Sequence, residues 1–285
     1  MSLLPQVAVA LPLALASSLS SGVSDFAGGM AARHAHVLRV LAVTAPASWL
    51  VTLALLPAIG GDFTVPAVSW GLASGVASAA AFTLFYECLA IGPMGLLSPV
   101  AAVISAVVPA GVGLAAGEHL GGGAVGGVFL AVLAVALISA GPSASHSRPS
   151  WRGFTYAVGA GVAISAQLVC LDRAPGSSGL APLVAAGAVS TLLVAVLLLA
   201  TRVGRAGTRA AFRWAGLAGV LGSLGNIAFL AAVRNGELAV VAVITALYPA
   251  GTVVLARTIL KERFTRTQVL GLGVAAAALV AFTLG

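Results

Sequence analysis

Long uncharged stretches restrict more than any other feature what this chain can fold into. No Asp, Glu, Lys or Arg occurs in residues 63–86, 119–146 or 174–201. Each stretch exceeds the roughly 20 apolar residues that cross a hydrocarbon core about 30 Å thick. Hydrophobic residues make up 60% of the chain and charged residues 7%, against about 25% charged in a typical soluble domain. A soluble protein of 285 residues could not bury this much apolar surface, so we expect an integral membrane protein.

Gly, Pro and charged residues divide the apolar sequence into ten candidate spans with short connections. Because every backbone polar group in lipid must be hydrogen-bonded internally, uninterrupted apolar runs of this length are predicted to be helices. Barrel strands would instead show alternating segments of about ten residues. The predicted fold class is therefore all-α, a polytopic membrane protein with ten transmembrane helices. We place them at residues 6–31, 38–58, 66–90, 94–116, 122–140, 152–171, 180–200, 211–233, 237–257 and 268–284.

The basic residues are distributed unevenly between alternate connections. The even-numbered connections carry only Arg173 and Arg234, and the odd-numbered ones carry the other twelve of the 14 basic residues. Cytoplasmic loops are enriched in Lys and Arg, so the odd connections are predicted to lie in the cytoplasm and both termini outside. The net charge of +7 thus serves orientation, and no nucleic-acid partner is expected. The twelve are Arg33, Arg39, Arg148, Arg152, Arg202, Arg205, Arg209, Arg213, Arg257, Lys261, Arg263 and Arg266.

Several function classes are disfavoured by the motifs that the chain lacks. Cys88 and Cys170 lie in apolar spans, so neither a disulfide framework nor a cysteine metal site is predicted. The first basic residue is Arg33, so the N-terminus lacks the charged region of a removable signal peptide. No Gly-x-x-x-x-Gly-Lys-Ser/Thr phosphate loop occurs, so we expect no ATP hydrolysis by that route. We predict no cofactor and no metal.

The chain matches itself when it is shifted by 144 residues. The coincidences include Trp and Glu, which are rare here, so composition does not explain them. Two repeats follow, residues 1–143 and 144–285, each with five predicted helices. Because five is odd, the copies are predicted to cross the membrane in opposite directions, a recurring transporter design. The matching pairs are Trp70/Trp214, Gly75/Gly219, Phe85/Phe229, Gly92/Gly236, Glu118/Glu262, Val125/Val269 and Gly127/Gly271.

Short motifs at equivalent places in the two repeats resemble the EamA family of the drug/metabolite transporter superfamily. The first repeat keeps Gly117-Glu118 and Gly127, but has His119 and Ser105 where the second has Arg263 and Pro249. The opening Gly22-Val23-Ser24-Asp25-Phe26 is also similar to first-helix sequences of some members. The second repeat carries the fuller pattern: Tyr248-Pro249, Leu260-Lys261-Glu262-Arg263, Gln268 and Gly271.

The resemblance implies a specific architecture and activity. It implies ten helices in two inverted halves around a central cavity lined by the first, third, fourth, sixth, eighth and ninth helices. Family members commonly export amino acids or other metabolites, which implies a place in the bacterial inner membrane. Many members have both termini inside, whereas the loop charges of this chain indicate the reverse. Both orientations stay open at this point.

Two carboxylates in the predicted spans are the first candidates for a transport site. Asp25 and Glu87 lie near ends of the first and third spans that face the same side of the membrane, and ionisable residues in spans are functional candidates. They could couple protons or balance a substrate amino group. The structural alternatives are an Asp25–Arg33 interaction and a Glu87 that reaches the membrane interface. Glu118 and its equivalent Glu262 are expected to be structural, pairing with neighbouring Arg or loop amides.

Neutral polar residues supply the other candidates. Ser21 and Ser24 belong to a small-residue stripe that either binds substrate or packs helices closely. Gln167 and Asn226 are amides that need partners at mid-membrane, and Thr245 and Tyr248 adjoin Pro249, which removes a backbone hydrogen bond. Tyr86 offers an aromatic wall, or packs. The predicted substrate-binding residues are Ser21, Ser24, Asp25, Tyr86, Glu87, Ser98, Gln167, Asn226, Thr245 and Tyr248.

These features favour a secondary transporter that works by alternating access between inverted repeats, as an exporter of small metabolites such as amino acids. Its partners are the lipid bilayer, the small-molecule substrate and, as a candidate coupling ion, protons. Internal duplication makes a monomer sufficient, with a dimer as the alternative. The other classes considered are a non-transporting membrane subunit or sensor and, least favoured, a membrane-embedded enzyme, because the spans hold no His or clustered carboxylates.

Overall fold

The computed structural model describes residues 4–91, 94–118, 120–139, 151–201, 203, 207–251, 255 and 265–284. Within these ranges the chain is helical, with one isolated bridge between Ala35 and Gly207 and no strand, so the predicted all-α class is confirmed. The elements are α1 (Leu4–Ala32), α2 (Val37–Ile59), α3 (Val65–Ile91), α4 (Met94–Ala115), α5 (Gly122–Ser139), α6 (Trp151–Asp172), the 3-10 turn η1 (Gly176–Ser178), α7 (Ala181–Thr201), α8 (Arg209–Val233), α9 (Leu238–Thr245) and α11 (Arg266–Leu284).

Six of the described helices are long and apolar enough to cross a membrane: α1, α2, α3, α6, α7 and α8. Shorter apolar helical stretches occupy Val100–Ala115, Gly122–Ile138, Leu238–Gly251 and Arg266–Phe282. The chain is therefore a multi-pass membrane protein. The count of ten crossings, which includes these four shorter stretches, stays a prediction.

The helix ends lie where Gly, His and Thr stop or start the backbone hydrogen-bond ladder. Gly60 ends α2 with a φ of 85° and donates its N–H to the Leu56 carbonyl, a conformation that favours glycine. The His36 side chain accepts the Leu38 N–H at the start of α2, and the Thr208 hydroxyl accepts the Ala211 N–H at the start of α8. Nine of the ten predicted spans begin and end within two residues of a helix.

The ninth predicted span, residues 237–257, was wrong as a continuous helix. α9 ends at Thr245, a turn follows at Ala246 and Leu247, and helical backbone resumes at Tyr248. Pro249 accounts for the interruption, because it has no N–H for the Thr245 carbonyl and its ring clashes with the carbonyl four residues earlier. Residues 252–254 and 256–257 lie outside the described part of the chain.

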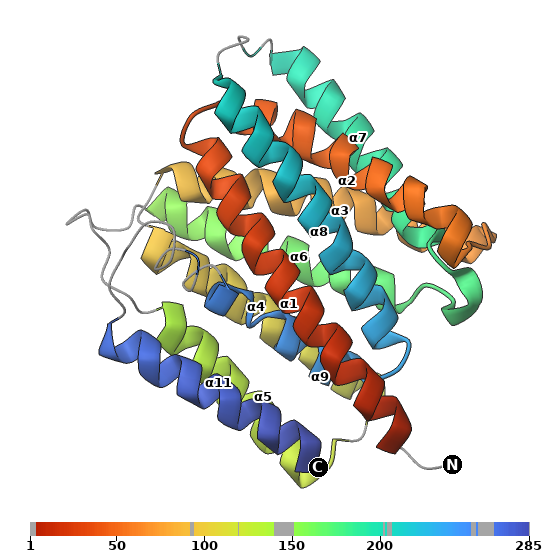
Figure 1. The fold of residues 1–285 in the computed structure, drawn as a ribbon, viewed down its shortest axis with the longest axis vertical. Helices are drawn as coiled ribbons and strands as arrows, with labels where there is room; N and C mark the ends of the chain where they lie inside the picture. The colour runs from red at the N-terminus through yellow and green to blue at the C-terminus, as the bar shows by residue number, and fades with distance from the viewer. Residues whose placement is uncertain are drawn as a thin grey trace.

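The helices pack so that segments far apart in sequence become neighbours (Figure 1). α1 lies along α8, α3 along α6 and α7, and α2 along α7 and α8, while α4 lies against α6 and α9 and α5 against α11. Small residues permit this closeness. A Cβ at Gly75 of α3 would collide with the Ala186 backbone of α7, and one at Gly219 of α8 would collide with the Thr44 carbonyl of α2.

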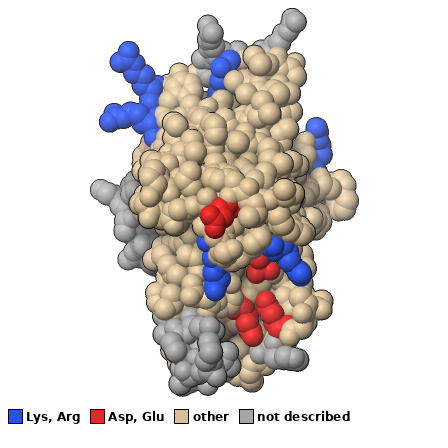
Figure 2. Space-filling model, turned by 90° about the vertical axis from the view of Figure 1, so that its right-hand side faces the viewer, with Lys and Arg blue, Asp and Glu red and all other residues tan. Residues whose placement is uncertain are grey.

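The two ends of the bundle differ in charge. At one end, the α1–α2 and α7–α8 connections meet through the Ala35–Gly207 bridge and an Arg39 hydrogen bond to the Val203 carbonyl at 2.6 Å. We name this the basic end because Arg33, Arg39, Arg209 and Arg213 lie at these connections. The opposite, acidic end carries Asp62, Glu118, Asp172 and Glu237, and Figure 2 shows acidic side chains gathered on that face. The start of α1 and the end of α11 both lie toward this end (Figure 1).

Backbone and side-chain contacts tie the acidic end together. The Asp62 N–H donates to the Ser178 carbonyl at 3.1 Å, and the Leu180 N–H donates to the Gly60 carbonyl at 2.9 Å. Arg234, which follows α8, donates to the Gly179 carbonyl at 2.7 Å and to the Ser178 hydroxyl at 3.2 Å. Partial burial lowers the pKa of the Arg234 guanidinium, but arginine stays protonated in proteins. Arg234 therefore fastens the α6–α7 turn to the end of α8.

Candidate functional site

Two neighbouring polar cavities lie inside the helix bundle. The first cavity is lined by α1, α2, α3, α6, α7 and α8. The second is lined by α1, α3, α4, α6, α8 and α9, together with Ala246 and Tyr248 just after α9. Phe82, Gln167 and Asn226 line both cavities, so these three side chains form the boundary between them.

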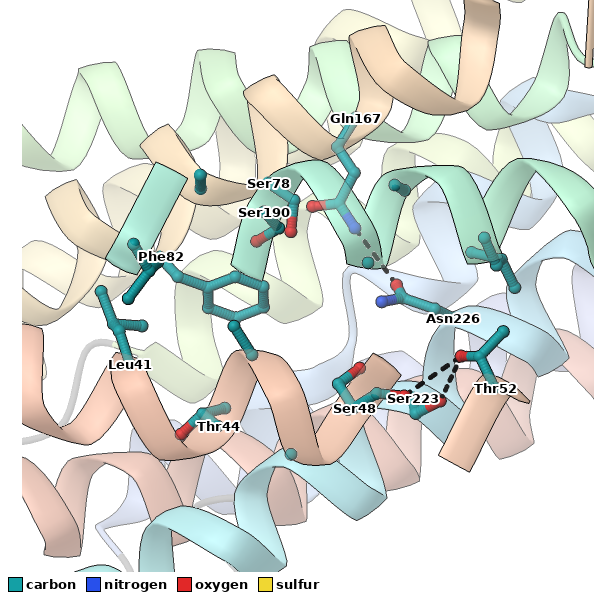
Figure 3. Close-up of a pocket in the computed structure, with 18 of the residues that line it drawn as sticks. Leu41, Thr44, Ser48, Thr52, Ser78, Phe82, Gln167, Ser190, Ser223 and Asn226 are labelled. Carbon is teal, nitrogen blue, oxygen red and sulfur yellow. Dashed lines mark hydrogen bonds between the residues drawn. The ribbon is translucent and has the colours of Figure 1, made fainter. Parts of the chain in front are cut away.

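An amide pair crosses this boundary (Figure 3). The side-chain nitrogen of Gln167 in α6 donates to the side-chain oxygen of Asn226 in α8 at 3.2 Å. Each amide thereby satisfies part of the hydrogen-bonding requirement of the other in an apolar bundle. Both amides retain further donors and acceptors that could meet a polar molecule.

The first cavity is rich in hydroxyl groups that already bridge helices. Ser24 of α1 donates to the Ala218 carbonyl of α8 at 2.8 Å, and Thr52 of α2 lies 3.0 Å from the Ser223 hydroxyl of α8. Ser74 of α3 donates to the Gln167 carbonyl of α6 at 3.3 Å. The cavity therefore combines hydroxyl groups with apolar side chains, and none of its described lining residues carries a charge. Its hydroxyl-bearing lining residues are Ser24, Thr44, Ser48, Thr52, Ser74, Ser78, Ser190 and Ser223.

The second cavity holds a carboxylate. Asp25 of α1 lines it and lies close enough to the Tyr86 and Tyr248 hydroxyls to interact with them electrostatically. Among the described residues no ion pair involves Asp25, so the suggested Asp25–Arg33 interaction is not seen there. No Lys, Arg or His occurs among the described residues lining either cavity. The Asp25 charge is thus not compensated within the cavity lining.

Several buried hydroxyls that line or adjoin the second cavity lack hydrogen-bond partners among the described residues. Ser17 Oγ, Tyr86 Oη and Thr245 Oγ1 are buried without a partner among the described residues. Ser17 and Thr245 line the second cavity, and Tyr86 lies beside it next to Asp25. Buried polar atoms in folded proteins are nearly always paired. These unpaired hydroxyls therefore indicate a candidate binding site for a polar ligand.

Most of the predicted binding residues meet at these cavities. Gln167 and Asn226 line both, and Ser24 lines the first. Tyr86 is fully buried, with its hydroxyl where a Gly28 Cβ would lie and its ring near Phe82 and Phe85 at centroid distances of 6.0 and 6.2 Å. The predicted residues that line the second cavity are Ser21, Asp25, Gln167, Asn226, Thr245 and Tyr248.

Three predicted residues are not among the described residues that line the cavities, and one of them is Tyr86, which is buried beside the second cavity. Glu87 lies in α3, is half-buried and lines neither cavity, so the structure does not bring it together with Asp25 there. Ser98 lies in α4, but its side chain is outside the described residues. All three assignments stay predictions.

α2 also contributes to the first cavity, and none of its residues was among the predicted ones. Thr44, Ser48 and Thr52 line the first cavity from this helix. Their spacing of four residues puts three hydroxyls on one helix face, and this pattern was available in the sequence. Thr44 also donates to the Val40 carbonyl of its own helix, which satisfies the hydroxyl locally.

Glu118 has the structural role expected of it, at an unexpected place. Its carboxylate accepts the Leu238 N–H at 2.8 Å and the Ala239 N–H at 3.0 Å, at the start of α9. The first N–H groups of a helix have no partner within the helix, and a carboxylate satisfies them. The bond therefore joins the connection after α4 to a helix about 120 residues later. Glu262 lies outside the described residues.

These helices and cavities define a polytopic helical membrane protein with polar groups at two interior cavities. Residues 151–284 match the model of the EamA-like transporter family, so the resemblance to this family is confirmed. Together with the apolar helices, the match indicates a membrane transporter of the drug/metabolite transporter type.

Other comparisons bear on the fold. A solved structure, described as a crystal structure of a protein, is similar over 96% of this chain and 96% of its own, with 16% sequence identity and a TM-score of 0.73. This likeness concerns the fold alone. It covers residues on both sides of position 151, so the N-terminal half shares in it. The comparison with curated proteins gave no match.

Proposed function

We propose that this protein is a secondary transporter that exports small metabolites, such as amino acids, across the bacterial inner membrane. The observation that carries the proposal is a pair of adjoining polar cavities, one with an uncompensated carboxylate, inside an apolar helix bundle with an EamA domain. Intramembrane carboxylates of this kind mark substrate or ion pathways by default.

We also propose that the two halves are inverted repeats. Gly127 of α5 packs against Phe282 of α11, and Gly271 of α11 packs against Ile138 of α5. These contacts are each other's counterparts under the shift of 144 residues, because 127 plus 144 is 271 and 138 plus 144 is 282. Duplicated halves related by a two-fold axis in the membrane plane would produce such exchanged contacts.

The helix pairs exchange in the same way. The shift relates α1 to α6 and α3 to α8, and the α1–α8 pair is matched by the α6–α3 pair. The α2–α8 pair is likewise matched by α7–α3, while α2–α7, α4–α9 and α5–α11 each join a helix to its own counterpart. This pattern supports two pseudo-equivalent halves of five helices.

The proposed mechanism is alternating access. Rocking of one half against the other would open the cavities first to one side of the membrane and then to the other. The Gln167–Asn226 pair joins α6 to α8 on the boundary between the cavities, so the substrate must pass it. A monomer contains both halves and suffices for this cycle. Protons are the candidate coupling ion.

Flux in proteoliposomes made with the full chain tests the proposal. Uptake of a panel of labelled amino acids and other small metabolites is measured with and without a pH gradient. We expect saturable flux for at least one compound, which an excess of the same unlabelled compound suppresses. A pH gradient that accelerates this flux would support proton coupling.

The same measurement separates the proposal from its alternatives. A non-transporting subunit or a sensor would bind a compound without moving it, so it would show stabilisation by ligand but no flux. If no compound in a broad panel crosses the membrane faster than in empty liposomes, the transport proposal fails. An enzyme would instead convert a compound into a product detectable by mass spectrometry.

A further inference from the structure

The distribution of charge between the cavities restricts what they can hold. The first cavity is lined by neutral residues throughout its described lining, and the second by neutral residues and Asp25. An ionised carboxylate away from water is costly unless a cation or hydrogen bonds compensate it. Because no Lys, Arg or His among the described lining residues offers this compensation, a bound cationic molecule and a proton are the remaining sources of positive charge.

The neutral groups around Asp25 suit an ammonium group. The Tyr86 and Tyr248 hydroxyls lie close to Asp25, and Thr245 of the same cavity presents a hydroxyl oxygen without a partner among the described residues. A primary ammonium donates three hydrogen bonds and accepts none, so hydroxyl oxygens and a carboxylate together match its needs. The interruption of α9 adds to this supply of acceptors, because Pro249 leaves the Thr245 carbonyl without its usual helical donor.

Aromatic rings form the rest of the wall. Phe82, Phe85 and Phe229 line the second cavity, together with Tyr248. Aromatic faces attract cations and also pack against apolar groups. A molecule with a cationic head and an apolar or aromatic body therefore finds a partner for each part.

A carboxylate on the same molecule finds hydrogen-bond donors but no cationic partner among the described lining residues. In an amino acid the carboxylate is separated from the ammonium by one carbon atom, so it would enter the field of Asp25 without a cationic group among the described lining residues. Like charges close together in a medium of low dielectric constant repel strongly. The cavity therefore discriminates by the charge of the whole molecule.

We infer that the second cavity binds the ammonium group of cationic amines, with Asp25 as the counter-ion, and that it prefers amines and amino-acid esters to zwitterionic amino acids. This inference rests on the proposed transport function and narrows its substrate class. Asp25 supplies the charge, the Tyr86 and Tyr248 hydroxyls beside it supply acceptors, and the phenylalanines of the cavity wall enclose the apolar body.

Tyramine exchange by purified full-length protein in liposomes tests the preference. Liposomes are loaded with unlabelled tyramine and receive labelled tyramine at about pH 6.5, far below the ordinary pKa of a primary amine. Unlabelled tyrosine methyl ester and tyrosine are then added as competitors. We expect the ester to compete at least about tenfold better than tyrosine. Equal competition by tyrosine would overturn the inference.

Asp25→Asn tests the counter-ion, because it keeps the shape of the side chain and removes its charge. We expect it to weaken tyramine exchange on the order of thirtyfold, as for the loss of one partner in a desolvated charge pair. The matched control is Asp62→Asn, which removes an exposed carboxylate outside both cavities and should leave exchange unchanged. If Asp25→Asn exchanges tyramine normally and loses only the response to a pH gradient, Asp25 is a proton site and the inference is wrong.

A measurement on the wild-type protein keeps the inference testable even if the Asp25→Asn variant does not fold. Tyramine should raise the Tm of the detergent-solubilised wild type, and tyrosine at the same concentration should not. Wild-type protein that is stabilised by tyramine but moves no compound would refute the transport function and keep the amine site. Wild-type protein that moves amino acids and is not stabilised by tyramine would keep the transport function and refute the amine site.

Discussion

Gln167 and Asn226 show how much depends on two side chains placed by different helices. Each is an amide in an apolar span, and each would be costly there without a partner. The structure pairs them at 3.2 Å on the boundary between the two cavities. The pair therefore stabilises the contact between α6 and α8. Its remaining donors and acceptors are available to a substrate that moves between the two cavities.

A double-mutant cycle tests whether these amides act as a unit. Gln167→Ala and Asn226→Ala should each reduce substrate flux, because each removes the partner of the other. The double variant should lose little more than either single one, with a coupling free energy of about 1 kcal/mol in transport efficiency. Initial rates of flux in proteoliposomes give this value. Strictly additive losses would show that the two amides contribute independently.

At the residue scale, most residues predicted for the site line the cavities, whereas their hydrogen-bond partners could not be predicted from the sequence. Asp25, Gln167 and Asn226 were recognisable because a charged or amide group in an apolar run has to be paired or functional. The hydrogen bond between Gln167 and Asn226 was not predictable, because it depends on how α6 and α8 rotate about their axes. Glu87 illustrates the same difficulty, since the sequence predicted a depth like that of Asp25 but the residue lines neither cavity.

Glycines govern the closest helix contacts. A Cβ at Gly75 of α3 would collide with the Ala186 backbone. A Cβ at Gly126 of α5 would enter open space. Both are helical, so both substitutions to Ala change helix propensity alike. They differ only in the space that surrounds them.

We therefore expect opposite effects from Gly75→Ala and Gly126→Ala. The first should lower the free energy of unfolding by about 1–3 kcal/mol, because α3 and α7 must separate to admit the methyl group. The second should be neutral or slightly stabilising. Thermal unfolding in the same detergent compares the two. A Gly75→Ala protein as stable as the wild type would show that α3 and α7 are not in close contact.

The hydrogen bonds from the first amides of α9 to the Glu118 carboxylate should stabilise the start of this helix. Glu118→Gln keeps one acceptor oxygen but loses the charge that favours a helix N-terminus. We expect a loss of about 1 kcal/mol in stability. Asp62→Asn, which changes an exposed carboxylate at the same end, is the control. Hydrogen exchange of the Leu238 and Ala239 amides should increase in Glu118→Gln alone, and unchanged exchange would argue against the bond.

Helix positions were the most predictable property of the elements. Apolar runs and the Gly, Pro and charged residues between them depend on the local sequence, so nine spans agree with helices to within two residues. The break in the ninth was recognisable in part, since Pro249 was known to remove a hydrogen bond. Its location at Ala246 and Leu247 required the structure, because a proline helix either bends or breaks depending on its neighbours.

For the whole molecule, the charges of the two ends make a prediction about topology. The basic end carries Arg33, Arg39, Arg209 and Arg213, and the acidic end carries four carboxylates. The positive-inside rule puts the basic end in the cytoplasm and both termini outside, whereas the family resemblance implies termini inside. The loop charges and the family resemblance therefore predict opposite sides of the membrane for every loop.

Cysteine labelling in intact cells decides between them. Asp62→Cys and Arg213→Cys lie at opposite ends of the bundle, and the native Cys88 and Cys170 lie within helices. We expect a membrane-impermeant maleimide to label Asp62→Cys in intact cells and Arg213→Cys only after the membrane is permeabilised. The reverse result would place the termini in the cytoplasm and show that loop charge does not set the orientation of this chain.

The bond between Glu118 and α9 has a mechanical consequence for the proposed rocking. It fastens a connection of the N-terminal half to a helix of the C-terminal half at the acidic end. Any rigid-body rotation that preserves both hydrogen bonds must turn about a point near Glu118. Displacements then grow with distance from that pivot, so the basic end would swing through the wider arc.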